Sequence, residues 1–242
     1  MADRNIVSIL PDAAALAEAA ADRVVEVLKA ALAERDLAHV ALAGGSTPRA
    51  VNALLVARPR CDAVDWSRVI FWFGDERCVP PADANSNYRM NCETLLDLLG
   101  VPLSQVHRMR GEDDPSAAAA DYDALLKREL GAQPRLDLVQ LGMGPEGHTA
   151  SLFPGTTKEI DRDKDCIAHY VPQLATWRIT LTPRAINAAR NVAITVGGAE
   201  KADALRAVLD GPRDPDVYPA QLVKPQHGEL RWLVDAAAAA RL

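Results

Sequence analysis

The segment HVALAGGSTPRAVNALLV (39–56) joins a short apolar run to a stretch with helical spacing through two adjacent glycines. Apolar runs of this length, bounded by turn residues, are typical of buried strands. Pro48 is well placed in the first turn of a helix that begins after the glycines. The segment therefore predicts a strand, a tight turn and a helix, which is the repeating unit of parallel α/β sheets.

The same alternation continues along the chain. Further strands are predicted at RVIFWF (68–73), LDLVQLG (136–142), CIAHYV (166–171), WRITLT (177–182), VAITV (192–196) and ELRWLVD (229–235). Helices are predicted from an N-cap at Asp12 to about Ala33, and over 87–100, 115–130, 149–153, 183–190 and 199–210. This pattern favours a mostly parallel sheet covered on both faces. We therefore predict one α/β domain over residues 1–242, whose first strand follows a single helix.

The composition is that of a globular protein with a hydrophobic core. The 242 residues are 49% hydrophobic, and 27 basic against 33 acidic residues give a net charge of −6. No block of like charges forms a polyanion-binding arm, so nucleic acid is not an expected partner. The four cysteines contain no C-x-x-C pair, and no export signal or apolar run near the roughly 20 residues of a membrane span occurs. We expect a cytoplasmic protein with reduced thiols and no membrane segment.

The loop after the first predicted strand has the features of an anion site. In open parallel sheets, ligands bind beyond the carboxyl ends of the strands. Gly44 and Gly45 allow close approach of the backbone, and Ser46 and Thr47 add hydroxyl groups at the start of a helix, whose free N–H groups favour phosphate. The P-loop spacing is absent. The alternative is an ordinary turn with a hydroxyl cap.

Charged residues follow other strands in the same way. Arg77 could grip a phosphate with its forked guanidinium, and Asp75 could accept hydroxyl hydrogens of a sugar. Arg178 begins a later strand, and Lys201 follows a second glycine pair at the start of a helix, where another anion-facing N-terminus is expected. Taken singly, Arg178 and Lys201 are expected to be surface charges, whereas Asp75 and Arg77 directly follow a strand, which favours a role in binding. Together with the 44–47 loop, the three cations can form one pocket for a phosphate monoester.

His148 lies in LGMGPEGHTASLFPG (141–155), directly after a predicted buried strand. A lone histidine is often structural, but its place in a glycine-rich loop favours catalysis, because imidazole suits a general base near neutral pH. No Cys/His cluster has zinc spacing, and neither H-E-x-x-H nor G-x-S-x-G is present. This leaves a base acting on water or on the substrate.

These motifs give a family resemblance that covers nearly the whole chain. Through AGGSTPRAVNALL, FGDERCVPPADANSNYRMN, LGMGPEGHTASLFPG, RITLTPRAINAARNVAITVGGAEKADAL and ELRWLVD, the sequence resembles the 6-phosphogluconolactonases of the glucosamine-6-phosphate isomerase/deaminase superfamily. The resemblance implies a Rossmann-like three-layer α/β/α fold, similar to glucosamine-6-phosphate deaminase. It also implies hydrolysis of 6-phospho-D-glucono-1,5-lactone to 6-phospho-D-gluconate in the oxidative pentose phosphate pathway, without a metal or organic cofactor.

The resemblance also implies roles for single residues. His148 would be the general base that activates water, and Asp75 would orient the sugar ring or the water. The phosphate would be held by the backbone of Gly44, Gly45, Ser46 and Thr47 and by Arg77, Arg178 and Lys201. The expected partner is the small-molecule lactone, and the oligomeric state stays open between a monomer and a small homo-oligomer. One departure is Glu146, where the family more often has an aspartate that turns more readily before glycine.

Two other functions compete with this interpretation. Glucosamine-6-phosphate deaminases carry a glutamate five residues after the motif histidine, where this chain has Phe153. They also have a tyrosine at the position of Arg77, so both differences favour the lactonase. A sugar-phosphate sensor would normally carry a helix-turn-helix segment before the fold, for which the sequence leaves little room.

Overall fold

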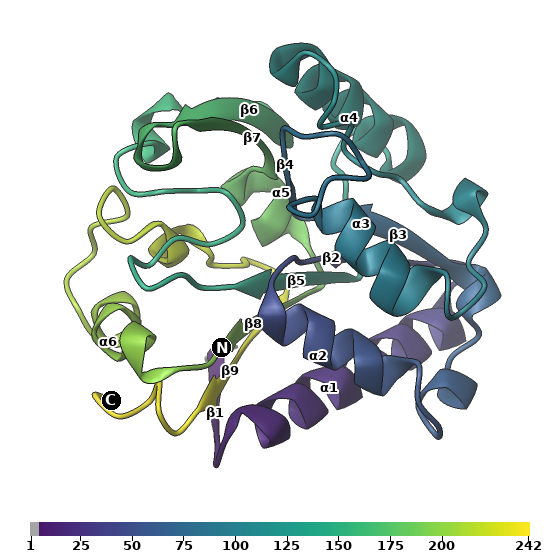
Figure 1. Cartoon of the computed structure of the whole chain (residues 1–242), viewed down its shortest axis with the longest axis horizontal. Helices are drawn as coiled ribbons and strands as arrows, with labels where there is room; N and C mark the ends of the chain where they lie inside the picture. The colour runs from purple at the N-terminus through teal and green to yellow at the C-terminus, as the bar shows by residue number, and fades with distance from the viewer. Residues whose placement is uncertain (1–4) are drawn as a thin grey trace.

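The computed structural model describes residues 5–242 and is built on a six-stranded sheet (Figure 1). The strands are β1 (Asn5–Leu10), β2 (Ala38–Leu42), β3 (Val69–Phe73), β5 (Leu138–Gly142), β8 (Asn191–Val196) and β9 (Glu229–Asp235). They lie in the order β1-β9-β8-β5-β2-β3, and every neighbouring pair is parallel. The predicted α/β class with a mostly parallel sheet is therefore confirmed.

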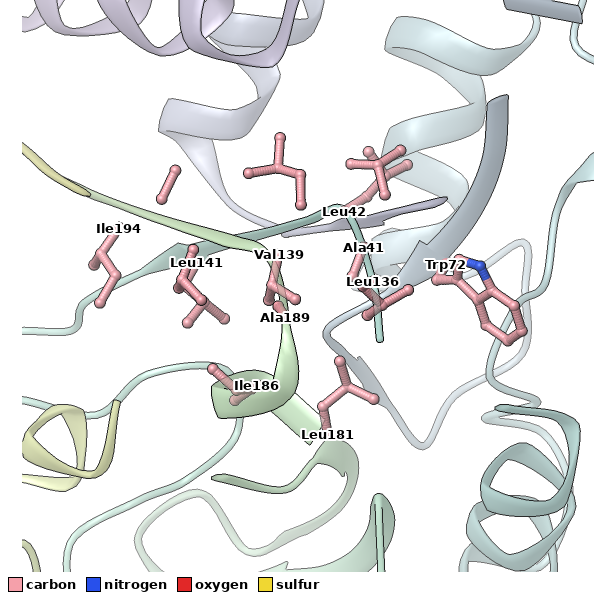
Figure 2. Packing of buried hydrophobic residues seen from close by; sticks show 14 of the residues in the cluster. Ala41, Leu42, Trp72, Leu136, Val139, Leu141, Leu181, Ile186, Ala189 and Ile194 are labelled. Carbon is pink, nitrogen blue, oxygen red and sulfur yellow. The ribbon is translucent and has the colours of Figure 1, made fainter. Parts of the chain in front are cut away.

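Helices cover both faces of this sheet. They are α1 (Ala13–Glu34), α2 (Ser46–Leu55), α3 (Asn87–Asn91), α4 (Pro115–Leu130), α5 (Pro183–Ala188) and α6 (Ala202–Leu209). α1 and α2 pack together on one face, and α5 lies on the other (Figures 1 and 2). The predicted N-cap of α1 is confirmed, because the Asp12 carboxylate accepts a hydrogen bond of 2.8 Å from the amide of Ala15.

The core lies between the sheet and these helices. Val139 and Leu141 of β5 and Ile194 of β8 point toward Ile186 of α5 (Figure 2). Trp72 of β3 is fully buried at the other end of this cluster. Strands buried on both faces become continuous apolar runs, which is why most of them could be predicted from short segments. No helix among the described residues is long and apolar enough to cross a bilayer.

A second, antiparallel sheet was not predicted. It consists of β4 (Asp75–Arg77), β7 (Thr176–Leu181) and β6 (Cys166–Val171), in the order β4-β7-β6. The expected strands at 166–171 and 177–182 exist, but they lie outside the main sheet: β7 pairs with the charged residues after β3, and β6 pairs with β7. In this register Arg77 lies opposite Arg178.

Three further expectations were wrong or incomplete. The first strand is β1, which precedes α1, so the chain does not start with a lone helix. The segment 87–100 begins as α3 and continues over Cys92–Leu96 as a π-helix. The helix expected over 149–153 is absent: Thr149 and Leu152 form an isolated bridge, and Ala150 has a φ of 48°. Five residues between a glycine loop and Pro154 are too few to propagate a helix.

Candidate active site

A cavity of about 260 Å³ opens at the carboxyl ends of β2, β3, β5 and β8. Its lining includes Gly44, Gly45, Ser46, Thr47, Asp75, Arg77, His148 and Lys201, which are all the predicted site residues except Arg178. The other lining residues are Ala43, Pro48, Asn87, Gln140, Leu141, Gly142, Met143, Gly144, Pro145, Ala150 and Thr195. Distant segments thus meet at one edge of the sheet, as open parallel sheets require.

The start of α2 forms one wall of the cavity. The N-cap residue is Gly45, with a φ of 110°, and no side chain caps the helix. The hydroxyls of Ser46 and Thr47 are therefore not used as caps, in contrast to the ordinary-turn alternative. N–H groups in the first turn of a helix have no partner within it, so this wall offers donors and a positive helix end to an anion.

Asp75 is fixed at the wall formed by β4. Its Oδ2 accepts a hydrogen bond of 2.6 Å from the hydroxyl of Ser151, and its Oδ1 accepts one of 3.2 Å from Nδ2 of Asn87. Asn87 in turn lies against Gly44, where a Cβ atom would come within 1.8 Å of the Asn87 side-chain oxygen. Glycine at position 44 therefore leaves the space in which Asn87 holds Asp75.

Arg77 and Arg178 lie side by side on β4 and β7. Arg77 donates to the carbonyl of Asn85 at 2.6 Å and forms no ion pair with a carboxylate of residues 5–242. Burial, and then the positive charge of Arg77, lower the pKa of Arg178, while Asp75 acts in the opposite direction. Arg178 is outside the cavity lining, so its role as a phosphate ligand stays a prediction. The paired guanidiniums favour a nearby anion.

Lys201 reaches the cavity from the segment that links β8 to α6. It ends a 3₁₀ turn, Ala199–Lys201, and forms no ion pair within the described part of the chain. The expected second anion-binding turn is only partly present, because the amide of Gly198 already donates to both oxygens of Asp235, at 3.1 and 3.0 Å. The ammonium group of Lys201, rather than the amide of Gly198, is therefore the group of this segment that can bind a ligand.

The loop after β5 places His148 in the cavity. The amide of Gly144 donates to the His148 carbonyl at 2.9 Å, and the amide of Gly147 donates to the Gly144 carbonyl at 3.0 Å. The imidazole ring stacks on Phe153, with centroids 4.2 Å apart and planes inclined by 21°. Its Nδ1 lies 3.2 Å from Oε2 of Glu146, close enough for an ion pair but without the alignment of a hydrogen bond. Nε2 has no partner among residues 5–242 and stays available to a ligand.

Glu76 supports the loop beside the cavity, and the sequence analysis assigned it no role. It is 2% exposed, and its carboxylate accepts hydrogen bonds of 2.7–3.0 Å from the amides of residues 77, 87 and 88 and from the Ser86 hydroxyl. Burial raises the pKa of Glu76, and these donors oppose that shift. Glu76 therefore ties β4 to the segment that carries Asn87. Its burial depends on tertiary packing, which an acidic triplet does not reveal.

Replacing Glu76 by glutamine is expected to lower the free energy of unfolding by about 2–3 kcal/mol. The new amide nitrogen would face at least one of the four donors and leave a buried N–H unpaired. Urea denaturation would measure the change, with the exposed Glu93→Gln as the control, since surface ion pairs contribute little. Equal unfolding midpoints for Glu76→Gln and the unmodified chain would show that these hydrogen bonds of Glu76 do not stabilise the fold.

Other lining residues were also missed. Asn87 belongs to a long polar loop in which no residue stands out, and Thr195 is the second-last residue of a mostly apolar strand. Gln140 is the only uncharged polar side chain in the LDLVQLG run, which was a readable signal. Within residues 5–242, no three His, Cys, Asp or Glu side chains gather into a metal-binding group.

Comparisons with known proteins agree with the fold and with the motifs. The family model for glucosamine-6-phosphate isomerases/6-phosphogluconolactonase matches residues 11–232. A 6-phosphogluconolactonase of Haemophilus influenzae is 36% identical over 83% of this chain and 85% of its own length. One of a Nostoc species is also 36% identical, over 99% of both chains.

Solved structures show the same relationship. The 6-phosphogluconolactonase from Trypanosoma cruzi has a TM-score of 0.89 at 28% identity, over 100% of this chain and 98% of its own. A monomeric glucosamine-6-phosphate deaminase shares the fold, with a TM-score of 0.83 at 21% identity and coverage of 98% and 100%. The family model spans nearly the whole chain, and the Haemophilus and Nostoc relatives exceed 30% identity over most of it. The chain therefore belongs to the glucosamine-6-phosphate isomerase/6-phosphogluconolactonase family.

Proposed function

We propose that this chain, as a single domain, hydrolyses 6-phospho-D-glucono-1,5-lactone to 6-phospho-D-gluconate in the oxidative pentose phosphate pathway, with water activated by His148. The observation that carries the proposal is one cavity that combines His148 with an anion-binding helix start, Arg77 and Lys201. The identity of the substrate is inferred from the relatives of this chain that are named 6-phosphogluconolactonase. A base and cations that line one cavity suit a lactone that carries a phosphate.

In the proposed reaction, His148 removes a proton from water as the water oxygen bonds to the lactone carbonyl carbon. The carbonyl electrons move to oxygen and form a tetrahedral oxyanion. When the oxyanion collapses, the bond from carbon to the ring oxygen breaks, and the protonated imidazole returns its proton to that oxygen. The product is the open-chain acid, and the histidine is regenerated without a cofactor.

Glu146 and Phe153 hold the imidazole for this task. A carboxylate 3.2 Å from Nδ1 favours a proton on that nitrogen, which leaves Nε2 as the base and stabilises the imidazolium that forms. Phe153 covers one ring face. A glutamate at position 153, as in the deaminases, would place a carboxylate against the ring. The glutamate at position 146 is long enough to serve in place of the family's more frequent aspartate.

Binding of the phosphate would fix the lactone relative to the base. The first turn of α2, Arg77 and Lys201 offer donors and positive charge, and Arg178 lies opposite Arg77 on the neighbouring strand. Asp75, held by Ser151 and Asn87, is placed to accept a substrate hydroxyl or to orient the water. The amides of Gly144 and Gly147 already bond within their loop, so they are not the donors for the oxyanion.

The test is the rate of lactone loss, with the lactone generated in place from glucose 6-phosphate and spontaneous hydrolysis subtracted. Acceleration by this chain, without ammonia release from glucosamine 6-phosphate, is the expected result. Ammonia release without lactone hydrolysis would indicate the deaminase reaction instead. Binding of 6-phosphogluconate with neither activity would indicate a sensor.

Replacing Lys201 by alanine is expected to raise the KM for the lactone by about tenfold, because one charge-assisted hydrogen bond to phosphate is lost. A smaller loss of kcat would follow if the lactone is held less firmly. Steady-state kinetics would measure both constants. Arg206→Ala, which removes an exposed cation from α6, is the matched control. An unchanged KM would remove Lys201 from the phosphate site.

A further inference from the structure

Gln140 is a polar side chain in an otherwise apolar strand, and it lines the candidate cavity. Val139 and Leu141 on either side of it are buried in the core, so alternation along β5 turns Gln140 to the opposite face (Figure 2). The carboxamide of Gln140 forms no hydrogen bond with any residue of 5–242, and its Nε2 atom is buried. The cavity therefore contains a carboxamide without a hydrogen-bond partner in the described part of the chain.

A buried amide nitrogen without an acceptor is unfavourable and rare in folded proteins. An aliphatic side chain at this position would avoid the cost, and the neighbouring positions of β5 are aliphatic. The other lining side chains give no reason for the donor: Asp75 already accepts from Ser151 and Asn87. Thr195, the nearest lining residue of β8 by register, donates to the Leu141 carbonyl at 3.3 Å. The acceptor for Gln140 is thus expected from the ligand.

The position of β5 in the sheet indicates which part of a ligand Gln140 would meet. β5 lies between β2 and β8. The chain leaves β2 into the loop with Gly44–Thr47, and it leaves β8 toward Lys201, so both anion-binding segments flank the end of β5 (Figure 1). Gln140 lies two residues before that end. A phosphate held between the two segments would lie over the Gln140 side chain.

We propose that Gln140 binds the substrate by donating a hydrogen bond to a phosphate oxygen. The last side-chain torsion of glutamine has a broad energy profile, so the amide can turn its nitrogen toward the cavity as the phosphate enters. The proposal rests on the proposed function only in that the ligand carries a phosphate. In this proposal, Gln140 adds an uncharged hydrogen-bond donor to the cations of the cavity. The affinity of the protein for the phosphate group of the substrate then depends on a residue of β5.

The test is Gln140→Met, which keeps the length of the side chain and removes the donor. Calorimetric titration with inorganic phosphate and with 6-phosphogluconate is expected to show affinities about tenfold weaker for both ligands. The KM for the lactone should rise in parallel while kcat changes less. Gln226→Met makes the same chemical change on the exposed surface and should leave both affinities unchanged. Thermal unfolding of each variant checks that the fold is intact.

Unchanged affinity of Gln140→Met for both ligands would overturn the proposal. Weaker binding of 6-phosphogluconate with unchanged binding of phosphate would also overturn it, since Gln140 would then contact the sugar. If the unmodified chain does not hydrolyse the lactone, the proposed function fails, but the phosphate titration still decides the role of Gln140. Gln140→Glu repels phosphate while keeping the shape, and it should weaken binding more than Gln140→Met does.

Discussion

His148→Ala is expected to lower kcat for lactone hydrolysis on the order of 10³-fold, the loss typical of a removed general base. Without the imidazole, water must attack the carbonyl unassisted, and no group returns a proton to the ring oxygen. The residues proposed to bind the phosphate are unchanged in this variant, so the affinity for 6-phosphogluconate should change little. Lactone loss in a coupled assay, corrected for spontaneous hydrolysis, measures the first effect, and calorimetry measures the second.

The matched control for this variant is His227→Ala, because His227 is exposed and lies outside the cavity. Equal lactone turnover by His148→Ala and the unmodified chain would falsify the assignment of the base. A parallel loss of turnover and of 6-phosphogluconate binding would instead show that His148 holds the cavity in shape. The two measurements therefore separate chemistry from architecture.

The order of strands and helices could largely be predicted because the main sheet is buried on both faces. β5 and β8 are mostly apolar runs, and α1 begins at an aspartate cap, so local sequence is enough to find them. β1 was missed because it is an edge strand with one neighbour: Ile6 and Ile9 remain 39% and 57% exposed, and its pattern resembles neither a buried run nor a clean alternation.

β4 could not be predicted by local reasoning. Its three residues, Asp75–Arg77, have no strand propensity and are extended only because β7 pairs with them from a segment a hundred residues away. The same pairing sets Arg178 directly across from Arg77, and Arg178 is outside the cavity lining. Sequence motifs thus pointed to most of the charged residues that line the cavity, while strand pairing fixes the position of Arg178 outside that lining.

Side-chain contacts within the site could not be predicted from the sequence either, because they also depend on segments that are far apart in the chain. Glu76 stands between two predicted site residues, yet it is buried and supports the loop rather than facing the cavity. Gln140 was visible as a polar residue in an apolar run, but its missing partner is evident only from the fold. The motif indicates which kinds of side chain lie near the site, whereas tertiary packing decides that Asp75 and Arg77 line the cavity and that Glu76 does not.

A substitution at Gly144 is also expected to have a large effect on activity, because the absence of a side chain at this position leaves room for the His148 ring. A Cβ atom at position 144 would lie 2.1 Å from Nδ1 and 2.2 Å from Cε1 of His148, and 2.7 Å from Oε2 of Glu146. Such contacts are shorter than atoms tolerate, so the imidazole must move. The backbone at Gly144 does not have a positive φ, and alanine can adopt its conformation.

Gly144→Ala is therefore expected to lower kcat by roughly 10²-fold, since displacement of a catalytic group by about 1 Å costs that much. Only the ends of two side chains have to shift, so the free energy of unfolding should fall by less than about 1 kcal/mol. Steady-state kinetics and urea denaturation of the same variant measure both quantities. Gly74→Ala is the control, because its added Cβ would meet its nearest neighbour at an ordinary 3.6 Å outside the cavity. Full activity of Gly144→Ala would show that the proposed catalytic role of His148 does not depend on this contact. A large loss of stability would show that the loop itself cannot accept the methyl group.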